Sequence, residues 1–131
     1  MNTDQLRDCY RGYIACLNHQ DWARLGQFVA HAVDYNGERV GLDGYQRMLE
    51  RDFQAIPDLR FVIAQLIAEP PHIAARLCFD CTPAGELFGV AVDGRRVVFS
   101  ENVFYQFDHT GKIGAVWSVI DKAAVVAQMG E

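Results

Sequence analysis

Residues 97–121, VVFSENVFYQFDHTGKIGAVWSVID, decide the fold, because two apolar stretches flank one well-defined turn signal. The signal is the segment DHTGK at 108–112, which suits a type I turn followed by a left-handed Gly111. This turn chemistry is typical of an antiparallel hairpin with a bulge. The segment therefore predicts two long paired strands, one over 97–107 and one over 112–120.

The register of this hairpin predicts which side chains share a face. Counting outward from Asp108 opposite Lys112 places Glu101 opposite Val119. Directly opposed residues share a face of the sheet, and one face would then carry Phe99, Glu101, Val103, Tyr105, Phe107, Ile113, Ala115, Trp117, Val119 and Asp121. This is the more apolar face, so we expect it to look toward the helices, with two carboxyls at one end.

The rest of the chain divides into helical and strand-like parts. Apolar side chains recur at helical spacing after Thr3, again after Asp21, and a third time from Asp43 until Pro57. Apolar, β-branched stretches then follow at 60–67, 72–79 and 87–92 before the hairpin, and 122–129 returns to helix-compatible residues. This order predicts an α+β fold in which a curved antiparallel sheet wraps around N-terminal helices to form a cone with an internal pocket.

Composition restricts the class of protein. The 131 residues are 50% hydrophobic and 22% charged, which is typical of a single globular domain over 1–131. A net charge of −5 without a basic cluster argues against nucleic acid and anionic membrane partners. The start lacks a signal-peptide pattern, so we expect a cytoplasmic location. No residues have the spacing of a metal site or a nucleotide-binding loop, so we expect no metal and no cofactor.

The two carboxyls of the apolar face have alternative interpretations. Burial raises the pKa of a carboxyl group toward neutrality, where it can transfer protons at pH 7. Asp121, however, directly precedes the helix-compatible segment KAAVVAQ and could instead cap that helix. Glu101 could equally lie in water beyond the pocket rim or pair with an arginine.

Three stretches stand out, namely 33–36 (VDYN) with 41–45 (GLDGY) and 53–59 (FQAIPDL), then 82–89 (TPAGELFG), and 111–121 (GKIGAVWSVID). Together with the closing Gln128-Met129-Gly130, they resemble the SnoaL-like polyketide cyclase or ester cyclase family, within the wider nuclear-transport-factor-2-like fold. The resemblance implies that Asp121, after the W-x-x-x spacing, is the acid/base of an intramolecular aldol ring closure. It also supports Trp117 and Tyr35 as pocket residues. The hairpin register adds Glu101, Phe99 and Val119 to the expected pocket, and the apolar pattern adds Phe53 and Phe88. The family's histidine and glutamate are replaced here by Pro83 and Ala115, and its first glycine by Cys81.

We therefore expect a cofactor-independent enzyme of the cyclase type that acts on a small apolar or polyketide-like carbonyl compound. The alternatives are a non-catalytic binding or scaffolding module, and an isomerase or dehydratase of the ketosteroid-isomerase type, because this fold serves all three. On the other sheet face, Phe104, Val116 and Ile120 form an apolar patch with the small and polar residues between them. Patches of this kind mark interfaces, so we expect a homodimer through the outer face of the sheet.

Overall fold

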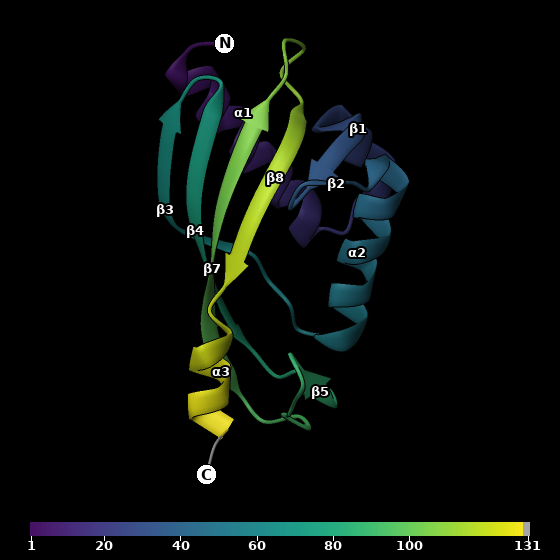
Figure 1. The fold of residues 1–131 in the computed structure, drawn as a ribbon, viewed down its shortest axis with the longest axis vertical. Coiled ribbons are helices and arrows are strands. Elements are labelled where there is room, and N and C mark those ends of the chain that lie inside the picture. The colour runs from purple at the N-terminus through teal and green to yellow at the C-terminus, as the bar shows by residue number, and fades with distance from the viewer. Residues whose placement is uncertain (130–131) are drawn as a thin grey trace.

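The computed structural model describes residues 1–129 and shows a curved, open sheet with the helices α1 and α2 on one face (Figure 1). In chain order the elements are α1 (Thr3–Asn18), η1 (Trp22–Gln27), β1 (Val29–Tyr35), β2 (Glu38–Arg39), α2 (Gly41–Ala55), β3 (Val62–Glu69), β4 (His72–Cys81), β5 (Glu86–Leu87), β6 (Val90–Ala91), β7 (Val97–Phe107), β8 (Ile113–Ile120) and α3 (Lys122–Met129). The predicted α+β class is confirmed. Gly130 of the closing motif lies outside the described residues.

Helix α1 begins one residue earlier than the sequence predicts. The Asn2 side chain accepts a hydrogen bond from the Gln5 amide at 2.8 Å, and the Gln5 side chain accepts one from the Asn2 amide at 2.9 Å. This reciprocal pair satisfies two amide groups at the helix start. The cap is therefore Asn2 rather than Thr3. The helix buries the apolar face that its spacing predicts, consisting of Leu6, Tyr10, Tyr13, Ile14, Cys16 and Leu17.

Helix α2 provides one wall of the site. It starts at Gly41, two residues before the predicted Asp43, and it ends at Ala55, two residues before Pro57. Its buried residues, Tyr45, Leu49 and Phe53, recur every four residues and so lie along one side of the helix. None of the helices formed by residues 1–129 is long and apolar enough to cross a membrane.

The main sheet has six strands in the order β2-β1-β8-β7-β4-β3. Strands β3, β4, β7 and β8 pair antiparallel in chain order, as predicted for the meander. Strand β1 pairs with β8 in the parallel direction, with Asp34 opposite Ala115 and Tyr35 opposite Val116. The prediction of a wholly antiparallel sheet is therefore wrong at this one pair, because β1 occupies the free edge of β8.

A small hairpin replaces the single strand predicted over 87–92. Strands β5 and β6 pair around Phe88 and Gly89, whose φ angles are 53° and 79°. Positive φ at both positions is what a two-residue type I′ turn requires. The Asp93-Gly94 turn also has positive φ angles, 52° and 81°, but it does not join two paired strands.

A bulge at Gly114 changes the register of the hairpin formed by β7 and β8. The turn at 108–112 forms as predicted, with Phe107 opposite Ile113, but the next pair is Gln106 with Ala115. Strand β8 thus has one extra residue, and every later side chain lies on the opposite face from the one predicted. Glu101 is opposite Ile120 rather than Val119.

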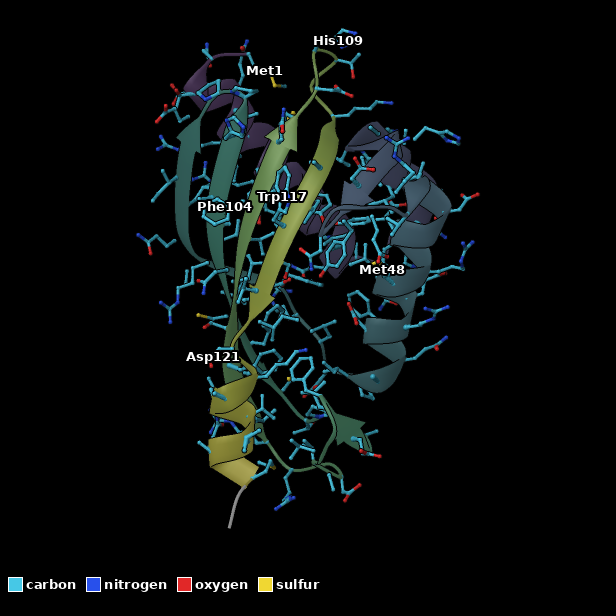
Figure 2. The ribbon with its side chains drawn as sticks, in the orientation of Figure 1. Met1, Met48, Phe104, His109, Trp117 and Asp121 are labelled. Carbon is cyan, nitrogen blue, oxygen red and sulfur yellow. The ribbon has the colours of Figure 1, made fainter. Side chains whose placement is uncertain are left out.

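The bulge exchanges the two faces of β8. Val116 is buried, whereas Trp117 is 44% exposed and Val119 is 70% exposed. Figure 2 shows Trp117 beside Phe104, which is 61% exposed, on the sheet face turned away from α1. Predicting Val116 and Ile120 on the outer face was therefore wrong, while predicting Phe104 there was right.

Candidate active site

A cavity of about 320 Å³ lies between α2 and the inner face of the sheet. Strands β7 and β8 and the hairpin β5–β6 also contribute to its walls. The lining residues are Tyr35, Met48, Arg51, Asp52, Ile56, Leu59, Phe61, Phe79, Leu87, Phe88, Phe99, Glu101 and Ile120. Most of this lining is apolar, with two carboxyls, one guanidinium and one phenol as its charged or polar groups. This is the usual composition of a small-molecule site.

Phenylalanine rings form one wall of the cavity. Phe79 and Phe99 are stacked with their ring centroids 5.0 Å apart, and Phe61 packs edge-on against Phe79 at 5.4 Å. Phe88 meets Phe99 at a right angle, 5.6 Å away, and the Lys122 ammonium lies 5.5 Å from the Phe88 ring centroid. Such a wall suits a flat, apolar ligand.

A smaller chamber of about 50 Å³ continues inward from the cavity. The two share Tyr35, Met48, Asp52, Phe61 and Glu101, so both carboxyls lie where the cavity narrows into the chamber. The chamber is otherwise lined by Tyr13, Leu17, Tyr45, Leu49, Leu77, Val103, Tyr105 and Val116. Three of these residues are tyrosines, so the inner end of the site is richer in hydroxyl groups than the outer cavity.

Glu101 points inward from β7 and accepts a hydrogen bond from the Ser118 hydroxyl of β8. Burial raises the pKa of the Glu101 carboxyl, and the Ser118 hydroxyl opposes part of that rise because it stabilises the ionised form. Glu101 is therefore a carboxyl group of raised pKa, held in one orientation inside an apolar site. Both properties suit a general base.

Asp52 is the second carboxyl of the site and comes from α2. Burial raises its pKa to about 6, and the negative charge of Glu101 contributes to the rise. Asp52 is nevertheless exposed to solvent along part of its surface, so screening by water weakens this effect. Only Glu101 receives the Ser118 hydrogen bond, and its charge raises the pKa of Asp52, so both effects favour protonation of Asp52 over Glu101.

The backbone of Ser118 is held by Asn36, the residue that follows β1. The Asn36 amide donates to the Val116 carbonyl at 2.8 Å, and the Ser118 amide donates to the Asn36 side-chain oxygen at 2.8 Å. The neighbouring residue Tyr35 lines the cavity. Burial raises the pKa of the Tyr35 phenol, and a hydrogen bond with Ser118 opposes part of that rise. The junction of β1 and β8 thus orients Tyr35 and Ser118 toward Glu101.

Four of the predicted site residues line the cavity together, namely Tyr35, Glu101, Phe99 and Phe88. Phe53 does not reach it. Its ring packs in the core, 6.0 Å from Trp22 and 6.1 Å from Phe61, centroid to centroid.

The predicted placement of Asp121, Trp117 and Val119 in the pocket is wrong. The Gly114 bulge turns Trp117 and Val119 to the outer face. Asp121 follows β8, is exposed, and does not line the cavity; Figure 2 places it where β8 meets α3. Its carboxylate accepts a hydrogen bond from the Ala124 amide at 3.2 Å, which is the helix-capping alternative.

Sequence reasoning missed Asp52, Arg51 and Ser118. A signal for Asp52 was present, because it lies four residues after Met48 and four before Ile56, within the apolar stripe of α2. A carboxyl within an apolar stripe is costly to desolvate unless it is hydrogen-bonded or paired, so such a position is a candidate functional residue. Ser118 could not be found, because the predicted register placed it on the outer face.

Taken together, a helix-covered, curved sheet with carboxyls in an apolar cavity defines the chain as a nuclear-transport-factor-2-like domain. Residues 7–129 match the family described as SnoaL-like polyketide cyclase, and the chain belongs to this family. A SnoaL-like polyketide cyclase from Agrobacterium tumefaciens strain C58 is 48% identical, with a TM-score of 0.94 over 99% of this chain and 100% of that one. Family and neighbour support a cyclase-type function.

More distant solved structures share the fold. IdmH from Streptomyces antibioticus is 19% identical, with a TM-score of 0.83 over 97% of this chain and 99% of its own. TsrD from Streptomyces laurentii is 20% identical, with a TM-score of 0.85 over 99% of this chain and 98% of its own. None of the curated proteins matches this chain.

Proposed function

We propose that this protein closes a ring in a polyketide-like carbonyl compound without a cofactor, with Glu101 as the general base and Asp52 as the general acid. The observation that carries the proposal is a pair of carboxyls in one apolar cavity that differ in their hydrogen bonding and electrostatic surroundings. Burial raises the pKa of both carboxyls, but the Ser118 hydroxyl opposes the rise at Glu101, whereas the Glu101 charge adds to it at Asp52. Two carboxyls whose environments separate their pKa values are suited to act as base and acid.

The proposed reaction is an intramolecular aldol addition. The Glu101 carboxylate removes a proton from the carbon next to a carbonyl group, leaving an enolate. The enolate carbon attacks a second carbonyl carbon of the same molecule, which forms the new carbon–carbon bond and an alkoxide. Asp52 gives its proton to the alkoxide, and proton transfer from Glu101 to Asp52 restores both carboxyls.

The apolar wall would contribute by folding the substrate. Ring closure requires the two reacting carbons to approach each other, and a rigid site lowers the entropic cost of that approach. The stacked Phe79 and Phe99 rings and the perpendicular Phe88 ring offer a shaped surface for this purpose. Arg51 is the one cation among the residues that line the cavity, and it suits a polar end of the substrate.

The test is turnover of a linear poly-β-carbonyl ester, with the cyclic product detected by mass spectrometry. E101Q should lower turnover by about 10²–10⁴-fold, because an amide cannot accept a proton at neutral pH. The matched control is E69Q, which makes the same change at an exposed residue at the end of β3. Full activity of a folded E101Q variant would refute Glu101 as the base.

The same experiment addresses the alternatives. A protein that binds the ester but never converts it would be a binding module. Conversion to an open-chain isomer or a dehydrated product would indicate isomerase or dehydratase chemistry at the same carboxyls.

A further inference from the structure

Two buried pairs of tyrosines lie next to the carboxyls, and each pair has one hydroxyl proton more than its own hydrogen bond uses. Tyr10 donates to the Tyr105 hydroxyl at 3.0 Å, so the proton of Tyr105 is left over. Tyr13 and Tyr45 are 2.6 Å apart, oxygen to oxygen, and either can donate. A hydroxyl carries one proton, so this second pair also retains one that its shared bond does not use.

The surplus concerns protons rather than oxygen atoms. Every buried side-chain nitrogen or oxygen among residues 1–129 already has a hydrogen-bond partner. The leftover protons, however, still need an acceptor, because a buried donor without one is costly.

Both leftover protons belong to residues on the wall of the inner chamber. Tyr105, Tyr13 and Tyr45 line the chamber of about 50 Å³, whereas Tyr10 does not. A space of this size holds one or two small polar atoms. Two donors that meet at one small chamber suit a single oxygen with two lone pairs.

The phenols remain donors across the useful pH range. Burial raises the pKa of Tyr13, Tyr45 and Tyr105 above the usual tyrosine range. The negative charge of Glu101 adds to the rise for Tyr13 and Tyr45. The same charge disfavours an anionic oxygen in the chamber, so the acceptor that fits the resting site is neutral.

We propose that the inner chamber is the subsite for the carbonyl oxygen of the substrate, which accepts hydrogen bonds from Tyr105 and from the Tyr13–Tyr45 pair. This assignment rests on the proposed function and specifies the substrate as a ketone inserted carbonyl-first. A carbonyl oxygen in the chamber leaves its neighbouring carbon at the neck, where Glu101 and Asp52 lie. As Glu101 removes the proton, negative charge develops on that oxygen, and preorganised donors stabilise it.

The experiment uses 1-tetralone as the probe, a rigid aromatic ketone with one carbonyl group. Isothermal titration gives its Kd, and infrared difference spectroscopy gives the carbonyl stretching frequency of the bound molecule. In the wild type the frequency should be lower than in hexane, because hydrogen bonds weaken the carbonyl bond. Y105F should lose a large part of this shift and weaken binding by about three- to tenfold.

The matched control is Y10F. It also deletes one hydroxyl from the same buried pair, but it leaves in place the hydroxyl of Tyr105, the member of the pair that lines the chamber. Y10F should therefore keep the wild-type carbonyl frequency, and melting curves show whether the two variants are equally folded. If Y105F does not fold, a crystal structure of the wild type with 1-tetralone serves instead, with the carbonyl oxygen expected within about 3.2 Å of the Tyr105 hydroxyl.

Three results would overturn the proposal. They are equal effects of Y10F and Y105F, a wild-type carbonyl frequency unchanged from hexane, and failure of 1-tetralone to bind at millimolar concentration. Each differs from a failure of the proposed function. If E101Q retained full turnover while only Y105F altered the carbonyl frequency, the base would be wrong and the subsite right.

Discussion

Ser118 donates a hydrogen bond to the Glu101 carboxylate across β7 and β8, from a diagonal rather than a directly opposite position. Glu101 is opposite Ile120, and Ser118 lies two residues before Ile120 on the same face. Diagonal neighbours in an antiparallel pair are within reach of a long side chain. The bond stabilises the ionised carboxylate, so it should lower the pH at which the base becomes active.

Removing this hydroxyl should shift the pH dependence of turnover. In S118A the ionised Glu101 loses a donor, so its pKa rises and the ascending limb of the pH–rate profile moves to higher pH. S118T is the matched control, since it retains a hydroxyl and suits a β-strand. Superimposable profiles for wild type and S118A would show that the bond does not affect the base.

Asp52 should make the folded protein less stable as the pH rises. Its pKa of about 6 in the fold exceeds the ordinary aspartate value of about 3.9. Below the ordinary value the carboxyl is protonated in both the folded and the unfolded state. Its favourable contribution to the free energy of unfolding is lost as the pH rises through about 6. D52N should therefore raise Tm at pH 7.5 by about 2–5 °C, with little gain at pH 4.

Asp58 provides a control, because its pKa is shifted in the opposite direction from that of Asp52. The Asp58 carboxylate accepts hydrogen bonds from the Thr82 amide at 2.9 Å and the Thr82 hydroxyl at 2.8 Å, and its pKa is lowered. D58N should therefore lower Tm at pH 7.5. Equal responses of D52N and D58N to pH would contradict the assigned direction for Asp52.

Asp121 should behave as a helix cap and not as a base. Asparagine can still accept the Ala124 hydrogen bond, so D121N should retain both its melting temperature and most of its turnover. D121A should lose about 0.5–2 kcal/mol of unfolding free energy. Thermal melts and the ring-closure assay measure both effects. A folded D121N variant with a hundredfold loss of turnover would instead restore Asp121 as a catalytic residue.

We propose that the outer face of the sheet forms a homodimer interface, with Phe104, Trp117 and Val119 near its centre. These large apolar side chains are 61%, 44% and 70% exposed, and such patches usually mark contacts between proteins. Light scattering at micromolar concentration should give twice the chain mass for the wild type.

The double variant F104K/V119K should give the monomer mass, because it places charges at the centre of the patch. V126K is the control, since Val126 is 52% exposed but belongs to α3 rather than to the sheet face. A monomeric wild type, or a dimer that survives F104K/V119K, would refute this interface.

Local patterns predicted the fold because they depend on neighbours in the chain. The DHTGK turn, the helical spacing of α1 and the bounds of β7 and α3 all follow from residues close in sequence. The bulge at Gly114 does not, because whether a strand bulges depends on how both of its neighbours pack. Because of this one extra residue, Trp117, Val119 and Asp121 lie outside the predicted site, although the fold class is as predicted.

The candidate site was predictable in part for a similar reason. Glu101 and Phe99 belong to a strand whose inward face the alternation reveals, whereas Tyr35 was expected from the family resemblance, and all three line the cavity. The partnership of Glu101 with Asp52 joins β7 to α2. Only the three-dimensional packing of helix against sheet brings these two carboxyls together.

The parallel pairing of β1 with β8 has a consequence for how the protein is made. Asn36 and Ser118, which this pairing links by a hydrogen bond, are 82 residues apart in the sequence. A ribosome releases β1 and α2 long before β8 exists to cover them, so a nascent chain must keep their apolar faces from aggregating in the meantime. Contacts between such distant segments also slow the folding search. The carboxyl pair is therefore assembled late. A ligand can bind the complete site only after β8 has been synthesised.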